Sequence, residues 1–132
     1  MTIDKIAWLH LSPDGKILST RSKGKDAYYL PGGKRDPGET DLQTLVREIK
    51  EELAVTVDST TAVHEGTFTA QAHGHPAGVE VQLTCYSAAH EGTPTPSSEI
   101  EEIRWLSYAD RPLVSPVDKL IFDHLHNAGR LK

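Results

Sequence analysis

Three glutamates lie within five consecutive residues in the middle of the chain, at Glu48, Glu51 and Glu52. On an α-helix, where successive residues are about 100° apart, all three side chains fall within an arc of about 100°. Like charges four residues apart, such as Glu48 and Glu52, destabilise an isolated helix by roughly 0.2–0.5 kcal/mol. We therefore expect a positive group among them. Divalent cations such as Mg²⁺ prefer oxygen ligands of this kind.

The segment around these glutamates has the pattern of an amphipathic helix that follows a glycine-rich loop. Thr40 can cap the helix, with Gln43 three residues later in a capping-box pattern, and the helix is expected to run to about Leu53. Its apolar residues share a second arc of about 100°, on the other side of the helix, and are expected to face the core. They are Leu42, Leu45, Val46, Ile49 and Leu53.

The spacing of these residues resembles the signature of the Nudix (MutT-like) hydrolases, G-x5-E-x7-R-E-U-x-E-E-x-G-U, in which U is a bulky aliphatic residue. In this chain the Nudix box spans about residues 33–55 and reads GKRDPGETDLQTLVREIKEELAV. Every defined position matches except Ala54, where the family has glycine. Alanine in left-handed geometry would cost about 1–2 kcal/mol, so this substitution predicts a change in the local turn and in stability rather than in the metal site.

The resemblance implies roles for the residues of the motif. Glu48 and Glu52 are implied as ligands of Mg²⁺, with Mn²⁺ as a possible substitute, and Glu51 as a ligand or as a residue that activates water. The backbone carbonyl of Gly32 is implied as a further ligand. We predict that three other residues, Gly33, Glu39 and Arg47, support the site, with Glu39 and Arg47 pairing to hold the loop against the helix.

Many members of the family use a further acid from a late loop, and here Glu99 or Glu102 is the candidate. Substrate-binding candidates come from the segment before the Gly-Gly pair: Arg21 and Lys23, with Lys25, could reach phosphates or could belong to a solvated basic loop. Tyr29 could stack on a base, although Tyr28 is an equal candidate because one of the two must face the core.

Two other features have simpler interpretations. His73 and His75 suggest a metal pair, but a flexible loop tip is the favoured interpretation. Cys85 is expected to be an inert core residue.

The order of the elements predicts an α+β fold. Residues 3–11 and 16–21 are expected to form a hairpin, and residues 62–72, 79–89 and 101–106 are expected to be strands. A second helix is predicted after Ser115, with Pro116 at its first position and an apolar stripe of Val117, Leu120, Ile121 and Leu125. The resemblance makes this a Nudix-type α/β/α sandwich: a mixed central sheet with a catalytic helix and a C-terminal helix, in a single domain over residues 1–132.

Composition limits the possible partners. The formal net charge of −5 over 132 residues argues against binding of duplex nucleic acid. No apolar run approaches the length of about 18 residues that suggests a membrane span. There is one cysteine and no basic-then-apolar leader pattern, so a cytoplasmic location is the default expectation.

Together these features predict a Mg²⁺-dependent hydrolase that cleaves a pyrophosphate bond in a nucleoside diphosphate linked to another group. The short chain favours a (deoxy)nucleoside triphosphate pyrophosphatase that releases a nucleoside monophosphate and pyrophosphate. One alternative is a nucleotide-sugar or dinucleoside polyphosphate hydrolase, and another is a catalytically silent nucleotide-binding module. The base, the leaving group and the choice between monomer and homodimer remain open, because the residues that recognise a base lie on variable loops and strands.

Overall fold

The computed structural model describes residues 1–132. Its helices and strands, in chain order, are β1 (Thr2–Trp8), β2 (Ile17–Ser22), β3 (Gly32–Lys34), α1 (Asp41–Leu53), β4 (Thr56–Val57), η1 (Ser59–Thr61), β5 (Val63–Gln71), β6 (Glu80–Ser87), β7 (His90–Glu91), β8 (Ile100–Leu106), η2 (Tyr108–Leu113) and α2 (Pro116–Asn127).

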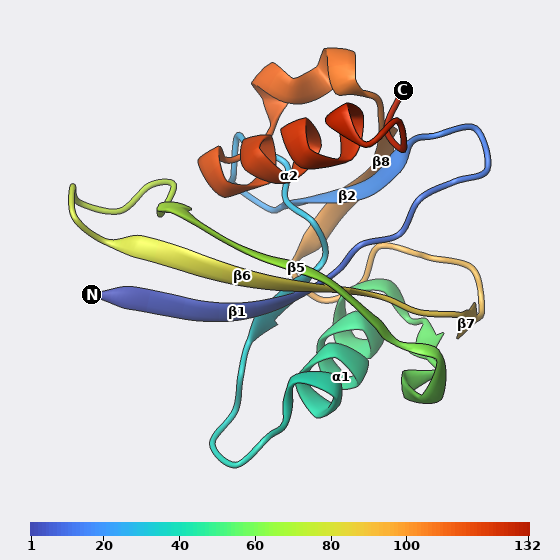
Figure 1. Cartoon of the computed structure of the whole chain (residues 1–132). Coiled ribbons are helices and arrows are strands. Elements are labelled where there is room, and N and C mark those ends of the chain that lie inside the picture. Colours follow the sequence, from blue (N-terminus) through green and yellow to red (C-terminus); the bar gives the residue numbers. More distant parts are fainter.

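The main sheet is mixed and lies between the two α-helices. Its strand order is β3-β1-β6-β5, with β1 parallel to β6 and antiparallel to β3. Figure 1 shows α1 on one side of this sheet and α2 on the other. Two smaller sheets pair β2 with β8 and β4 with β7. The predicted α+β fold, with a mixed sheet between two helices, is confirmed.

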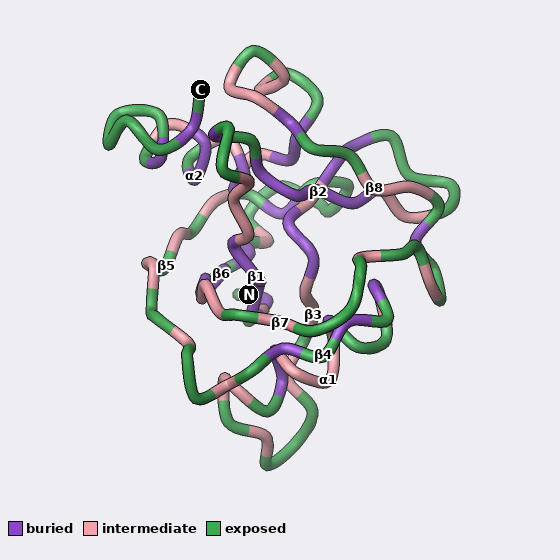
Figure 2. The backbone as a smooth tube through the Cα atoms, turned by 90° about the vertical axis from the view of Figure 1, so that its right-hand side faces the viewer, coloured by how far each residue is buried: buried purple, intermediate pink, exposed green.

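Alternation along β1 sends side chains into two apolar layers. Ile6 and Trp8 pack with the buried face of α1, which contributes Leu45, Ile49 and Leu53. Ile3 and Ala7 belong to the other layer, which contains the buried side chains of α2. Figure 2 shows that backbone along β1 and β2 is largely buried, whereas most connecting loops are exposed. Because β1 is covered on both faces, it fixes α1 and α2 relative to each other.

The predicted hairpin between residues 3–11 and 16–21 is wrong in its pairing. The turn does reverse the chain, but only one bridge, Leu11 to Ile17, joins the two segments. From there β2 diverges and pairs along its length with β8, while β1 takes β3 and β6 as neighbours. Burial of both faces of β1 decides this pairing, because strand register follows the surface that must be covered.

The second helix begins as predicted but its apolar stripe differs. Ser115 caps α2 by accepting a hydrogen bond from the Asp118 N–H (3.4 Å), and Pro116 is the first helical residue. Leu120 was predicted to face the core, yet it is 42% exposed. Phe122 is fully buried in its place, since the helix is rotated toward β5 and β6. None of the helices combines the length and apolar character needed to cross a membrane.

Candidate active site

Helix α1 has a defined beginning and end, and these fix the positions of its glutamates. The predicted capping box is present: Gln43 N–H donates to the Thr40 hydroxyl (3.2 Å), and Thr40 N–H donates to the Gln43 side chain (2.9 Å). At the other end, the carbonyls of Glu52 and Leu53 accept hydrogen bonds from Ser97 and Thr95, both at 2.9 Å. The segment after β7 therefore satisfies helix carbonyls that would otherwise lack partners.

Ala54 ends the helix in left-handed geometry, with φ 57° and ψ 31°. The expectation that alanine would change this turn is wrong, because the geometry that favours glycine is kept. The side chains on either side explain why the chain tolerates it: Leu53 and Val55 are both fully buried and hold the turn in place. A non-glycine residue in left-handed geometry costs about 1–2 kcal/mol, and packing of Leu53 and Val55 in the core offsets this cost.

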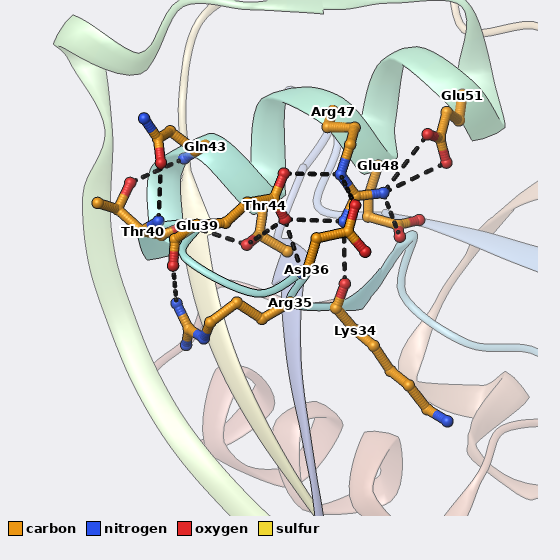
Figure 3. Close-up of polar contacts among 10 residues, drawn as sticks. All are labelled: Lys34, Arg35, Asp36, Glu39, Thr40, Gln43, Thr44, Arg47, Glu48 and Glu51. Atoms are coloured by element: carbon orange, nitrogen blue, oxygen red, sulfur yellow. Dashed lines mark hydrogen bonds and ion pairs between the residues drawn. The ribbon is translucent and has the colours of Figure 1, made fainter.

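Arg47 is the centre of a polar network that joins the glycine-rich loop to α1 (Figure 3). Its guanidinium donates to both carboxylate oxygens of Glu39 (2.7 and 2.9 Å) and to the carbonyl of Lys34 (3.0 Å). The Arg47 hydrogen bond holds the pKa of Glu39 at about 2, below its usual range. Planar two-point pairing of this kind fixes orientation as well as charge. The expected pairing of Glu39 with Arg47 is present.

The same guanidinium lies beside two of the three glutamates. Arg47 Nη1 is 3.0 Å from Glu48 and 3.4 Å from Glu51. Arg47 is therefore the positive group that lies beside Glu48 and Glu51. Burial raises the pKa of Glu48 despite the arginine, whereas Glu51 is largely solvent-exposed.

The Gly32–Gly33 pair lets the loop backbone approach the glutamates. A Cβ on Gly33 would lie 2.4 Å from the carboxyl carbon of Glu48. A Cβ on Gly32 would lie 2.0 Å from the Ile6 carbonyl oxygen, and its φ of +153° also favours glycine. Within the expected glycine-rich loop, residues 32–34 form the short strand β3 at the edge of the sheet.

Glu52 points back to this strand. Its Oε1 accepts a hydrogen bond from the Gly32 N–H at 2.8 Å. Burial raises the pKa of Glu52 to about 8; the Gly32 hydrogen bond opposes this shift and the nearby charge of Glu48 adds to it. A half-buried carboxylate with a raised pKa is typical of functional sites.

The residues present fit a divalent cation, although they are not gathered around one point. No group of three His, Cys, Asp or Glu side chains lies close enough together to hold a metal ion. Glu51 is turned toward Arg47, and Glu52 toward Gly32. Burial disfavours the charge of both Glu48 and Glu52, and a nearby cation relieves that cost with the oxygen ligands that Mg²⁺ prefers.

The candidate late acids have different surroundings. The Glu102 carboxylate accepts from Arg21 Nε (3.1 Å) and from the Tyr28 hydroxyl. Glu99 is exposed, its backbone carbonyl accepts from the Lys23 N–H, and it lies two residues after Ser97, whose N–H donates to the Glu52 carbonyl. None of these two acids and two basic residues lines the cleft described next.

A cleft of about 220 Å³ extends from Glu52 and Gly32 to α2. Tyr29 lines it and is half-buried, whereas Tyr28 is buried, which resolves the choice between the two tyrosines in favour of Tyr29. His73 lies at the cleft beside Tyr29 and pairs with Asp26 (3.0 Å). His75 also lines the cleft, so the exposed turn between β5 and β6 that carries both histidines lies against the cleft.

Sequence reasoning missed two residues of this cleft. Asp118 is in the first turn of α2; its fully buried carboxylate lines the cleft and accepts from Leu30 N–H (2.7 Å) and Ser115 Oγ (2.9 Å). Burial raises the pKa of Asp118 to about 6. Lys5 also lines the cleft, on the face of β1 otherwise occupied by Ile3 and Ala7. A lysine within that apolar alternation was the signal available in the sequence.

Comparison with known proteins assigns this arrangement to a family. The family model of the NUDIX domain matches residues 4–125. The chain therefore belongs to the Nudix hydrolase family, whose members act on pyrophosphate bonds. No curated protein sequence matches it.

Three solved structures share the fold. A MutT Nudix hydrolase from Burkholderia pseudomallei is 22% identical, with a TM-score of 0.76 over 93% of this chain and 97% of that one. A MutT protein from Bacillus halodurans is 25% identical, with a TM-score of 0.71 over 98% and 85%. The dihydroneopterin triphosphate pyrophosphohydrolase of E. coli is 20% identical, with a TM-score of 0.70 over 92% of each chain.

Proposed function

We propose that this protein is a Mg²⁺-dependent hydrolase that cleaves (deoxy)nucleoside triphosphates to a nucleoside monophosphate and pyrophosphate. We also propose that the chain forms a single domain. The observation that carries the proposal is the cleft that joins Glu52, on the Nudix helix, to the buried Asp118 on α2. A substrate that spans this cleft has a polar organic group at one end and a pyrophosphate at the other. Nucleotides have that chemistry. Dihydroneopterin triphosphate, which the name of the E. coli relative gives, likewise joins an organic group to a triphosphate.

The metal end would be built by Glu48, Glu52 and the Gly32 carbonyl, with Glu51 as a ligand or as the base for water, and with Mn²⁺ as a possible substitute for Mg²⁺. A bound divalent cation neutralises phosphate charge and lowers the pKa of a bound water. Glu99, which is exposed, or Glu102 could supply a further ligand; Glu102 would first have to leave Arg21 and Tyr28, which hold its carboxylate.

The protein's own contribution to the reaction is orientation and proton transfer. The Glu39–Arg47 pair holds the loop before α1, so that Gly32 and Gly33 stay beside Glu52 and Glu48. Water attacks phosphorus, the bond to the leaving phosphate oxygen breaks, and Glu51 or Glu52 accepts the proton of the water. Phosphoryl transfer requires mainly positioning and charge stabilisation of this kind.

The nucleoside end would lie between Tyr29 and α2. Tyr29 offers an aromatic face, and Leu30, Leu83 and Val117 give the cleft apolar walls. The two Asp118 oxygens each accept one hydrogen bond from the protein and retain capacity for a donor on the base. This end of the cleft suits a flat ring that carries N–H groups.

One experiment tests the metal site without relying on turnover. Mn²⁺ binding is measured by electron paramagnetic resonance for the wild type, for Glu52→Gln and for the control Glu91→Gln, which changes an exposed glutamate on β7. We expect Glu52→Gln to weaken Mn²⁺ binding at least tenfold while the control leaves it unchanged. Equal binding by all three proteins would remove Glu52 from the metal site.

A substrate panel then separates the proposed activity from its alternatives. Nucleoside triphosphates, nucleotide sugars and dinucleoside polyphosphates are incubated with Mg²⁺ and the products are identified. We expect triphosphates to be cleaved fastest. Faster cleavage of a nucleotide sugar or dinucleoside polyphosphate would reassign the substrate, and binding without any cleavage would indicate a silent nucleotide-binding module.

A further inference from the structure

Lys5 lies on β1, one of the two inner strands of the main sheet, between β3 and β6. Its neighbours on the same face of β1, Ile3 and Ala7, are buried in the core layer of α2. Lys5 itself is half-buried and lines the cleft between Glu52 and Asp118. A lysine at this position takes the place of an apolar residue. Its burial stabilises the fold less than burial of an apolar side chain would.

The ammonium group of Lys5 has no partner in the protein. It makes no hydrogen bond and no ion pair within 4.0 Å, although Arg47, Arg35 and Arg21 all do. Glu52 and Asp118 influence it only at longer range. Burial lowers the pKa of Lys5, and the positive charge of Lys34 lowers it further. An ammonium that is half-buried without a partner indicates a missing anion.

A second lysine lies directly across the strand pair. The register of β1 and β3 places Lys34 opposite Lys5, on the same face of the sheet. Figure 3 shows the Lys34 side chain pointing away from α1. Like charges directly opposite each other destabilise a sheet. An anion bound near Lys5 and Lys34 would offset this repulsion.

We propose that Lys5 binds the phosphate group attached to the nucleoside and so positions the substrate between Asp118 and Glu52. This inference rests on the proposed function, because it takes a nucleotide as the substrate. Lys5 lines the same cleft as Glu52 and Asp118 and is close enough to both carboxylates to feel their charge. A phosphate that links a ring near Asp118 to a metal near Glu52 would therefore pass within reach of it. Lysine serves such a site as a compact charge with rotatable donors.

The test compares binding of a nucleoside with binding of its 5′-monophosphate, which is a product and is not consumed. The four deoxynucleosides and their monophosphates are titrated in Mg²⁺ by calorimetry against wild type, Lys5→Met, Lys5→Arg and Lys34→Met. Lys5→Met keeps the apolar stem and removes the charge. Lys16→Met, at an exposed position outside the cleft, is the matched control.

For the monophosphate that binds the wild type best, we expect Lys5→Met to weaken binding about 10- to 100-fold, as for loss of a charge-assisted hydrogen bond. Binding of the matching nucleoside should change less than about twofold, and Lys5→Arg should recover part of the loss. Thermal unfolding of each variant shows that it is folded. The control should bind like the wild type.

Three results would overturn the proposal. These are equal losses for nucleoside and monophosphate in Lys5→Met, no loss for either, or a wild type that binds no monophosphate more tightly than its nucleoside. The proposed hydrolysis fails separately, in the substrate panel. A protein that cleaves nothing but shows the phosphate-specific loss would retain Lys5 as a phosphate-binding residue.

Discussion

The raised pKa of Glu52 predicts how the stability of the metal-free protein depends on pH. An ordinary glutamate in the unfolded chain has a pKa of 4.5, whereas burial raises that of Glu52 in the folded protein to about 8. Between these values the folded state binds more protons than the unfolded state, so the free energy of unfolding falls as pH rises from about 4.5 to about 8 and then levels off.

The magnitude follows from the same two values. Each tenfold change in proton affinity corresponds to about 1.4 kcal/mol, so the full difference sets an upper bound of about 5 kcal/mol. The carboxylate is open to the cleft, where solvent screens it, and a fall of about 1–3 kcal/mol is therefore expected. Gln at this position keeps an acceptor for the Gly32 N–H but cannot ionise.

The assay is urea unfolding at pH 5, 6, 7 and 8 in EDTA, for the wild type and Glu52→Gln. Asp118 also has a raised pKa, of about 6, and contributes to the pH dependence of both proteins. The difference between their free energies of unfolding therefore reports the contribution of Glu52 alone. We expect Glu52→Gln to gain about 1–3 kcal/mol relative to the wild type between pH 5 and pH 8. Mg²⁺ should restore the wild type at pH 8. A difference that stays constant with pH would refute the assignment.

Four substitutions around the site have expected outcomes. Ala54→Gly should raise the free energy of unfolding by about 0.5–1 kcal/mol in urea titrations, because glycine relieves left-handed strain but adds entropy to the unfolded chain; a loss of stability would contradict this. Gly33→Ala should reduce kcat/KM at least tenfold in a triphosphate assay, because its Cβ would displace the Glu48 carboxylate; full activity would show that Glu48 is free to move. Arg47→Lys should lower both stability and kcat/KM, because one ammonium cannot make the two-point pair with Glu39. Removing the partner, in Glu39→Gln, should reproduce most of that loss, and an unaffected Arg47→Lys protein would argue against the network.

The Nudix helix was predictable because its signals are local. The cap at Thr40, the apolar stripe and the spacing from Gly33 to Glu52 all lie within one continuous segment. The pairing of Glu39 with Arg47 follows from the same spacing. The left-handed turn at Ala54 was not predictable, because burial of Leu53 and Val55 by distant parts of the chain holds it.

The cleft was harder to predict because it depends on contacts between distant segments. Asp118 meets the Leu30 N–H across 88 positions of sequence, and no local pattern distinguishes that contact from an ordinary helix cap. Arg21 and Glu102 are brought together by the pairing of β2 with β8, which the predicted hairpin did not include. Strand pairing, rather than residue type, therefore decided which of the predicted substrate-binding residues face the cleft.

Phosphorus-31 magnetic resonance of the reaction products tests the central claim most directly. The protein is incubated with each deoxynucleoside triphosphate and Mg²⁺, with Glu52→Gln and Glu91→Gln in parallel. Cleavage between the first and second phosphates predicts equal amounts of nucleoside monophosphate and pyrophosphate from the wild type and from Glu91→Gln, and at least a hundredfold slower release from Glu52→Gln. Release of orthophosphate and a nucleoside diphosphate, or undiminished turnover by Glu52→Gln, would contradict the account.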